Sequence, residues 1–138
     1  MKSKGDFAIA VQILLSCAQK KGGLVSSAEL AESVGVHPSR IRTIVSKLAK
    51  AAILEAREGR SGGVCLKRPA GKVDLEEVLR VVDPSPFIKI HETPKSAKCL
   101  VSCGMEKVME LVHSKVEEAA RKSLRTFHLD DLLEFAVE

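Results

Sequence analysis

The sequence is poor in aromatic residues and has no segment long and apolar enough to cross a membrane. It contains no Trp and no Tyr, and its 4 Phe are the only aromatic residues. Modules that bind RNA or single strands stack bases on aromatic rings, so this class is disfavoured. The apolar stretch around Leu14 and Leu15 is too short to span a bilayer, and no signal peptide precedes it. We therefore expect a cytoplasmic protein with no membrane partner.

Patterns typical of enzymes are also missing. There are no paired carboxylates, no nucleophile with a neighbouring base and no phosphate-binding loop. The glycine-rich stretch from Gly59 to Gly63 lacks the lysine of a P-loop. We expect no catalytic activity. The four cysteines of a cytoplasmic protein normally stay reduced, so we expect no disulfide framework.

Charge is distributed unevenly along the chain. Residues 1–72 hold 13 Lys and Arg against 5 Asp and Glu, whereas residues 73–138 hold 9 against 13. A basic first half and an acidic second half favour a nucleic-acid contact made by the first half. Apolar residues make up 45% of the 138 residues, which is enough for the core of one domain.

A short helix is predicted between Ser26 and Gly35. Ser26 is placed to cap its first turn, and Glu29, three residues further on, completes a capping box. Gly35 suits the left-handed backbone that commonly ends a helix.

A second helix is predicted to begin at Pro38, because proline suits the first helical position. Its apolar residues recur at helical spacing and predict one buried face, formed by Ile41, Ile44, Val45 and Leu48. The opposite face holds no acid and consists of Ser39, Arg40, Arg42, Thr43, Ser46, Lys47 and Lys50. Such a face is typical of contact with a phosphate backbone, where each neutralised phosphate releases counterions. The alternative is a basic face that is merely solvated.

A glycine-rich hairpin is predicted from Leu54 to Arg68. Two extended runs flank its tip, where glycines permit positive φ and close backbone approach. Arg57 and Arg60 are placed to reach phosphates or the minor groove. Two short helices and such a hairpin predict a winged helix-turn-helix, in a mostly α protein with a small β-hairpin.

Further helices are predicted outside this motif. Their expected ranges are Phe7 to Lys20, Leu75 to Val82, Met105 to Phe127 and Leu129 to Phe135. Asp74 is placed to cap the second of these, with Glu77 completing a capping box, and Asp130 to cap the last. Phe135 is expected to pack back on the fold. The long helix carries an apolar stripe that favours a dimerisation helix over an intramolecular cap on the first helix.

The run from Phe7 to about Asp83 resembles the Rrf-two family of bacterial winged helix-turn-helix transcription regulators. The resemblance is carried by SSAELAESVGVHPSRIRTIVSKLAKAAILEAREGRSGGVCLKRP and by the Asp-Leu-Glu-Glu-Val that follows. Its members include the IscR, NsrR and CymR regulators, and the later loop is most similar to the YwnA-like branch. The resemblance implies a homodimer that binds double-stranded DNA at a palindromic operator.

The predicted function is a homodimeric, sequence-specific, DNA-binding transcriptional regulator, in the first instance a repressor, with a redox or small-molecule signal as a candidate input. The alternative is a protein-interaction module built on a winged helix, without DNA binding. We expect a winged helix-turn-helix domain at 1–83, a linker and effector loop at 84–104, and the dimerisation and C-terminal helices at 105–138. The residues predicted to contact DNA are Ser27, His37, Ser39, Arg40, Arg42, Thr43, Ser46, Lys47, Arg57, Arg60, Ser61, Gly62 and Gly63.

The resemblance implies a signal input in the loop before the long helix, where this chain has His91, Cys99 and Cys103. An iron–sulfur cluster needs three or four thiolates or substitutes, so we expect no cofactor, with a cluster as the less favoured alternative. Zinc on these three residues lacks a visible fourth ligand. Cys99 and Cys103 are four residues apart at a helix start, which suits a thiol redox sensor. The alternative is that both cysteines only pack.

Overall fold

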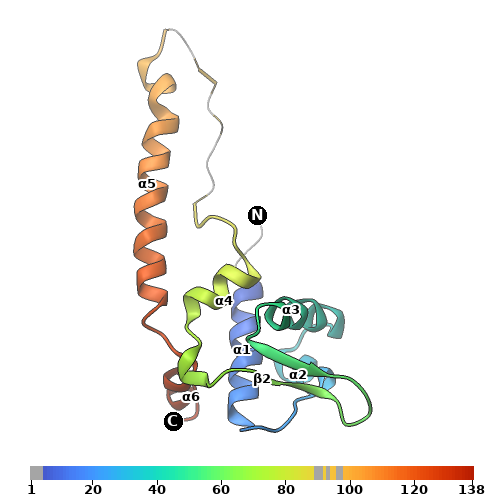
Figure 1. The fold of residues 1–138 in the computed structure, drawn as a ribbon. Coiled ribbons are helices and arrows are strands. Elements are labelled where there is room, and N and C mark those ends of the chain that lie inside the picture. Colours follow the sequence, from blue (N-terminus) through green and yellow to red (C-terminus); the bar gives the residue numbers. More distant parts are fainter. Residues whose placement is uncertain (1–4, 89–91, 93, 96–97) are drawn as a thin grey trace. The chain divides into compact units, whose positions relative to one another are not determined.

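The computed structural model describes residues 5–88, 92, 94–95 and 98–138, and the chain divides into two units (Figure 1). The first unit joins residues up to Pro84 with Leu124–Glu138, and the second spans Ser85–Ser123. The elements in chain order are α1 (Gly5–Gln19), α2 (Ser27–Val34), α3 (Pro38–Lys50), β1 (Leu54–Arg57), β2 (Gly63–Leu66), the 3-10 turn η1 (Ala70–Lys72), α4 (Leu75–Val82), α5 (Leu100–Leu124) and α6 (Leu129–Ala136). The predicted mostly α fold with one small hairpin is confirmed. In the described part of the chain, no helix has the length and apolar character needed to cross a membrane.

The start and end of α2 are set by contacts between neighbouring residues. The Ser26 hydroxyl accepts a hydrogen bond from the N–H of Glu29, and the Glu29 carboxylate accepts one from the N–H of Ser26, both at 3.1 Å. The backbone hydrogen bond from Ser26, together with the nearby Lys20 ammonium, lowers the pKa of Glu29. Gly35 ends the helix with a φ of 78°. Both the capping box and the left-handed glycine agree with the prediction.

The core of the first unit is built around α1, which lies between α4, α6 and the α2–α3 pair (Figure 1). Ile13 and Leu14 of α1 have no exposed surface, and Leu129 of α6 is equally buried. The predicted buried face of α3 is confirmed, with Ile41, Ile44, Val45 and Leu48 all in this core. Complete burial of one such aliphatic side chain contributes about 1.5–3 kcal/mol, so the apolar face of α3 holds the helix firmly in place.

The hairpin is antiparallel, with Leu54 of β1 paired with Leu66 of β2. It is tied to the rest of the first unit by the connection between α1 and α2. The N–H of Val25 donates to the Val64 carbonyl at 2.9 Å, and the N–H of Val64 donates to the Val25 carbonyl at 2.8 Å. Because Val64 is also buried in the core, the base of the hairpin is fixed on both sides.

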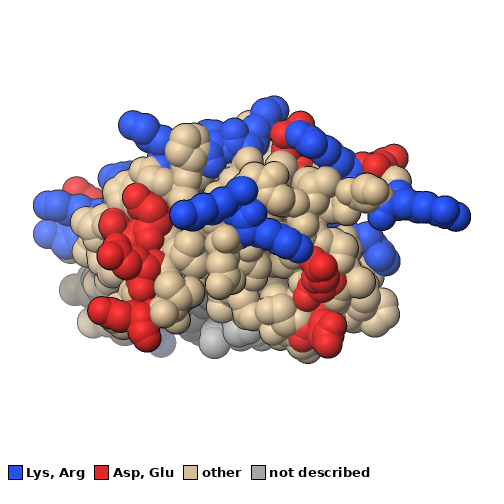
Figure 2. Space-filling model, turned by 90° about the horizontal axis from the view of Figure 1, so that it is seen from below, with Lys and Arg blue, Asp and Glu red and all other residues tan. Residues whose placement is uncertain are grey.

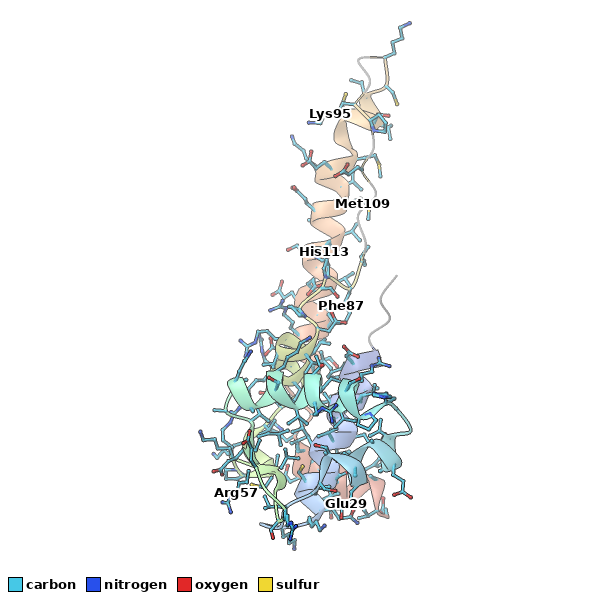
Figure 3. All side chains as sticks on the ribbon, turned by 90° about the vertical axis from the view of Figure 1, so that its right-hand side faces the viewer. Glu29, Arg57, Phe87, Lys95, Met109 and His113 are labelled. Atoms are coloured by element: carbon cyan, nitrogen blue, oxygen red, sulfur yellow. The ribbon has the colours of Figure 1, made fainter. Side chains whose placement is uncertain are left out.

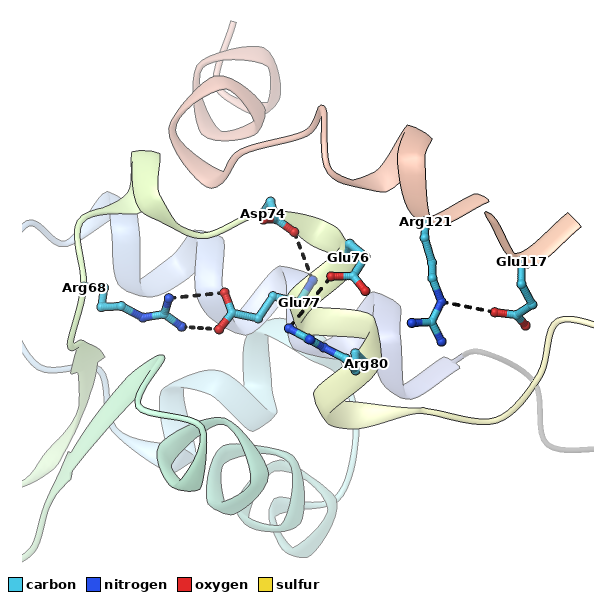
Figure 4. Close-up of polar contacts among 7 residues, drawn as sticks. All are labelled: Arg68, Asp74, Glu76, Glu77, Arg80, Glu117 and Arg121. Atoms are coloured by element: carbon cyan, nitrogen blue, oxygen red, sulfur yellow. Dashed lines mark hydrogen bonds and ion pairs between the residues drawn. The ribbon is translucent and has the colours of Figure 1, made fainter. Parts of the chain in front are cut away.

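The start of α4 follows the prediction only in part. The Oδ1 atom of Asp74 caps the helix by accepting a hydrogen bond from the N–H of Glu77 at 3.0 Å. The Glu77 carboxylate, however, accepts two hydrogen bonds from the guanidinium of Arg68, at 2.6 and 3.2 Å (Figure 4). The second half of the predicted capping box is therefore wrong, because a two-pronged arginine contact is a stronger partner for a carboxylate than one backbone amide.

The long helix α5 is longer at its start than predicted. It begins at Leu100 rather than Met105, and it ends at Leu124 rather than Phe127. Cys99 lies directly before this helix, and its sulfur accepts a hydrogen bond from the N–H of Ser102 at 3.4 Å, at the position of a capping residue. Cysteine is a weak acceptor and gives no usual start signal, which is why the sequence placed the helix later.

The terminal helix α6 packs on the first unit, although the sequence-based division grouped it with the long helix. Leu129 is fully buried, and its N–H donates to the Val73 carbonyl at 3.2 Å. Asp130 lies inside the helix, where its Oδ1 accepts a hydrogen bond from the N–H of Asp131, so the predicted cap at Asp130 is wrong. Phe135 is 78% exposed, so its predicted packing is also wrong.

In the second unit, Glu117 joins α5 to the chain that precedes it. Its Oε1 accepts a hydrogen bond from the N–H of Phe87 at 2.8 Å. Its Oε2 lies 3.4 Å from the Nε of Arg121 (Figure 4). His113 stands one turn earlier, with its Nε2 at 4.0 Å from Glu117 (Figure 3). These contacts are polar, and α5 has no buried residue.

Candidate nucleic-acid interface

α3 presents an exposed face without any acidic side chain. The Nδ1 of His37 caps the helix by accepting a hydrogen bond from the N–H of Ser39 at 3.1 Å. The Thr43 hydroxyl donates to the Ser39 carbonyl at 3.0 Å, one turn away. The exposed residues are those predicted from the sequence, namely Ser39, Arg40, Arg42, Thr43, Ser46, Lys47 and Lys50. A capped, core-anchored helix holds these polar groups on a rigid surface.

A groove of about 640 Å³ lies between α3 and the hairpin. Seven of the predicted DNA-contacting residues line it: Ser27, Arg42, Ser46, Arg57, Arg60, Gly62 and Gly63. Arg42 comes from α3, whereas Arg57 and Arg60 come from the hairpin. Three guanidinium groups along one concave surface concentrate positive potential, which suits a polyanionic ligand.

The other six predicted residues lie outside the lining of this groove: His37, Ser39, Arg40, Thr43, Lys47 and Ser61. Two of the cations contact other parts of the first unit. Both the Nε and the Nη2 of Arg40 donate to Oδ1 of Asp6 in α1, at 3.0 and 2.7 Å. The Nζ of Lys47 donates to the Val82 carbonyl at the end of α4, at 3.4 Å. The predicted interface thus has two parts. Seven residues line the groove, and six lie outside it, of which Arg40 and Lys47 contact other helices of the first unit.

Gly62 and Gly63 are needed by the backbone of the hairpin tip itself. A Cβ atom at Gly62 would lie 2.8 Å from the Gly59 carbonyl oxygen, and one at Gly63 would lie 2.6 Å from the Val25 carbonyl oxygen. Gly63 also has a φ of 154°, which side-chain-bearing residues rarely adopt. Their conformation therefore has a sufficient structural reason, and direct contact of these glycines with DNA stays a prediction.

The groove also contains residues that the sequence analysis did not single out. Glu58 brings a carboxylate to the hairpin tip, and Ala49 and Ala56 supply small apolar surfaces. Ala56 belongs to β1 and Glu58 directly follows that strand, so their nearness in sequence to Arg57 is the signal that could have found them. The contribution of Ala49 depends on how close the hairpin comes to α3, which no local pattern reveals.

Figure 2 shows the charges on the side of the molecule seen from below in Figure 1. Lys and Arg side chains lie along the upper margin of this view, at both of its ends and across its middle. The right-hand end is the side toward which the β1–β2 hairpin projects in Figure 1. Asp and Glu lie mainly lower on the same face, with a few near the upper margin, so the upper margin is the more basic part of this view.

The cysteines have contrasting surroundings. Cys17 is buried in α1, and burial, followed by the effect of Cys65, raises its pKa to about 12. Cys99 is exposed, and its Sγ accepts a hydrogen bond from the N–H of Ser102 at 3.4 Å. Hydrogen bonds from the backbone and then the hydroxyl of Ser102 lower the pKa of Cys99. Cys103 is exposed and its N–H donates to the Cys99 carbonyl at 3.3 Å, so the two residues lie one helical turn apart at the start of α5.

Metal-binding residues do not gather anywhere in residues 5–88, 92, 94–95 and 98–138, where no three His, Cys, Asp or Glu side chains come together. The zinc set considered from the sequence includes His91, which lies outside the described residues. Cys99 and Cys103 alone are too few for an iron–sulfur cluster, which takes three or four protein ligands. The described donors therefore do not fit such a group.

Comparison with known proteins identifies the family. Residues 1–134 match the model of the Rrf2 (Rrf-two) family, described as iron-dependent transcriptional regulator. The chain is 32% identical over 134 residues to YwnA, an HTH-type transcriptional regulator of Bacillus subtilis, with 96% of each chain covered. A transcriptional regulator from Lactobacillus plantarum has the same fold, with a TM-score of 0.81 at 24% identity over 94% of this chain and 88% of that one. The oxidized form of Staphylococcus aureus CymR matches with a TM-score of 0.73 at 21% identity over 97% of both chains. The chain belongs to the Rrf2 family of transcriptional regulators and carries its DNA-binding winged helix.

Proposed function

We propose that this protein is a homodimeric repressor that binds a palindromic operator of a bacterial operon, in the cytoplasm. The observation that carries the proposal is the groove in which Arg42, Arg57 and Arg60 meet beside the acid-free face of α3. Every phosphate that these cations neutralise releases counterions and so strengthens binding to duplex DNA. The proposal includes no catalytic step.

Within this proposal, α3 lies in the major groove of the DNA. Recognition helices of this class contact base edges, and Arg42 and Ser46 are the α3 residues that both face the groove and carry hydrogen-bonding groups. Arg57 and Arg60 contact the adjacent backbone or minor groove from the hairpin. Ser27, at the first position of α2, adds a hydroxyl to a phosphate contact.

The homodimer is supported by the apolar surface of α5. Val108 is 50% exposed, Leu111 60% and Val112 41%, and the helix has no buried residue. These residues are separated by one helical turn or less, and a contiguous apolar surface of this kind marks an interaction site. The helix spans 25 residues, or roughly 37 Å, which is long enough for an extended seam. A second copy would also supply the second half-site reader that a palindrome requires.

We further propose that Cys99 and Cys103 provide a thiol redox input. The Cys99 thiolate would attack one oxygen of hydrogen peroxide and break the O–O bond, leaving the sulfur as a sulfenic acid while the second oxygen departs as hydroxide, which takes a proton from solvent to become water. The Cys103 thiol would then displace water from the sulfenic acid to form a disulfide. The lowered pKa of Cys99, the exposure of both thiols and their spacing of one helical turn support this role. The family description mentions iron, but the described residues give no fitting donor set, so no step here involves it.

The test first identifies an operator by selecting, from a pool of random duplex DNA sequences, those that the protein binds. Arg57→Ala combined with Arg60→Ala should weaken binding by about 100-fold and reduce the slope of log K against log salt by about 1.8, or 0.9 per phosphate. The matched control is Lys107→Ala with Lys122→Ala, which removes two exposed cations from α5. Equal losses in both variants would contradict the proposed interface. An absence of any duplex binding would favour the protein-interaction alternative.

A further inference from the structure

Arg40 occupies the first turn of α3, yet its charge is already paired inside the chain. Its Nε and Nη2 both donate to Oδ1 of Asp6, at 3.0 and 2.7 Å. Asp6 belongs to the first turn of α1, 34 residues away in sequence. Both side chains remain partly exposed, at 48% for Arg40 and 37% for Asp6, so an external anion can reach the pair.

This pairing distinguishes Arg40 from the other cations of α3. Lys47 contacts a backbone carbonyl rather than a carboxylate. Within the part of the chain that the structure describes, Arg42 and Lys50 make no ion pair with an acidic side chain. One position on an otherwise acid-free surface thus carries its own counter-charge, contributed by a different helix.

The geometry of the contact determines what a DNA phosphate would meet. Arginine holds anions through pairs of parallel N–H groups, and Asp6 occupies the pair formed by Nε and Nη2 of Arg40. The free amides at the start of α1 also attract anions, and the Asp6 carboxylate adds a negative charge at that place. A phosphate can bind here with this pair of N–H groups only after it displaces Asp6.

We propose that Asp6 is a specificity-determining residue that withholds Arg40 from non-specific phosphate contacts. The inference rests on the proposed DNA-binding function and deepens it. Non-specific binding consists almost entirely of phosphate contacts, so the carboxylate costs a non-specific complex about one contact. In the operator complex, Arg40 stays paired with Asp6 and base contacts made by other α3 residues supply the affinity, so the carboxylate costs that complex less. Specificity is a difference of affinities, and a built-in competitor for one contact increases that difference.

The test is Asp6→Asn in the full-length protein, measured by fluorescence anisotropy on the selected operator and on a duplex of scrambled sequence. The affinity for the scrambled duplex should rise roughly fivefold or more, and its salt slope should steepen by about 0.9, the value of one added phosphate contact. The operator affinity should change less, so the ratio of the two affinities falls. Folding is checked by the thermal midpoint, which a lost surface ion pair should barely move.

Two matched variants separate this role from a general charge effect. Glu134→Gln removes one exposed carboxylate from α6 and should leave the salt slope unchanged. In an Arg40→Gln background, Asp6→Asn should have no further effect on the scrambled duplex, since the contact it releases is gone.

The outcomes distinguish the two proposals. If the wild-type protein binds DNA but Asp6→Asn behaves like Glu134→Gln, the role of Asp6 is overturned and the DNA-binding function stands. If Asp6→Asn lowers the affinity for the scrambled duplex, the role is also overturned, because Asp6 then assists binding. If the wild-type protein binds no duplex, both proposals fail.

Discussion

α3 and α5 are both amphipathic, but only α3 covers its apolar face within the chain. Ile41, Ile44 and Leu48 of α3 are at most 1% exposed. Val108 and Leu111 of α5 are at least half exposed, and no residue of that helix is buried. An apolar stripe therefore shows that a helix needs a partner surface, without showing which molecule supplies it.

The thiols of the two units also differ in burial, because Cys17 is buried and Cys99 is exposed. Cys17, in the core of the first unit, has a pKa raised to about 12, mainly because burial penalises the thiolate. Cys99, at the start of α5, has its pKa lowered by hydrogen bonds from Ser102. The first unit therefore supplies a stable frame, whereas the second has exposed apolar side chains and an exposed thiol of lowered pKa.

The strongest test of the comparison is to place charges on the apolar face of α5. Val108→Asp with Val112→Asp should convert the proposed dimer to a monomer, because two carboxylates cannot be buried unpaired in the seam. Operator affinity should fall by more than about 100-fold, since the second half-site would no longer be held at high effective concentration. Sedimentation velocity and anisotropy titration measure the two effects.

Lys107→Asp with Ser114→Asp is the matched control, because it adds two carboxylates to exposed polar positions of the same helix that lie beside the apolar stripe rather than within it. It should leave the dimer intact. A wild-type protein that sediments as a monomer at all concentrations would remove the basis of this prediction.

A smaller effect is expected from truncating one apolar side chain in each helix. Leu48 is fully buried, so Leu48→Ala should lower the free energy of unfolding by about 2–5 kcal/mol through lost contacts and a residual cavity. Leu111→Ala should leave that free energy nearly unchanged in dilute, monomeric protein and should instead weaken dimerisation. Urea denaturation at several protein concentrations separates the free energy of unfolding of the monomer from the free energy of dimerisation. Equal losses for both variants in the monomer would show that α5 also packs within its own chain.

The smallest expected effect concerns the rate at which the thiols react. A lowered pKa leaves more thiolate at neutral pH, so Cys99 should be alkylated by iodoacetamide much faster than Cys17. As pH rises, the rate at Cys99 should level off below the ordinary thiol pKa, whereas Cys17 should stay unreactive until the pH approaches 12. Peptide mass spectrometry follows each site. In urea the two rates should converge, and a difference that persists after unfolding would exclude the folded structure as its cause.

Much of the fold could be predicted because its signals are local. The Ser26–Glu29 capping box, the left-handed Gly35 and the four buried residues of α3 all follow from spacings of a few residues, and the structure confirms them. The predictions that were wrong involve competition from elsewhere. Glu77 was expected to complete a cap, but Arg68 folds close enough to bind it. The assignment of single residues to the DNA contact stays a prediction, since the structure contains only the protein.

The sequence by itself determined where helices begin, which of their faces are apolar and that α3 has a basic exposed side, because these properties depend on neighbours within about one helical turn. Only the tertiary structure decided that Arg42 shares a groove with Arg57 and Arg60, and that Arg40 is held by Asp6. The physical reason is distance. A hydrogen bond or a shared electrostatic field acts over a few ångströms in space, and folding alone decides which distant residues come that close.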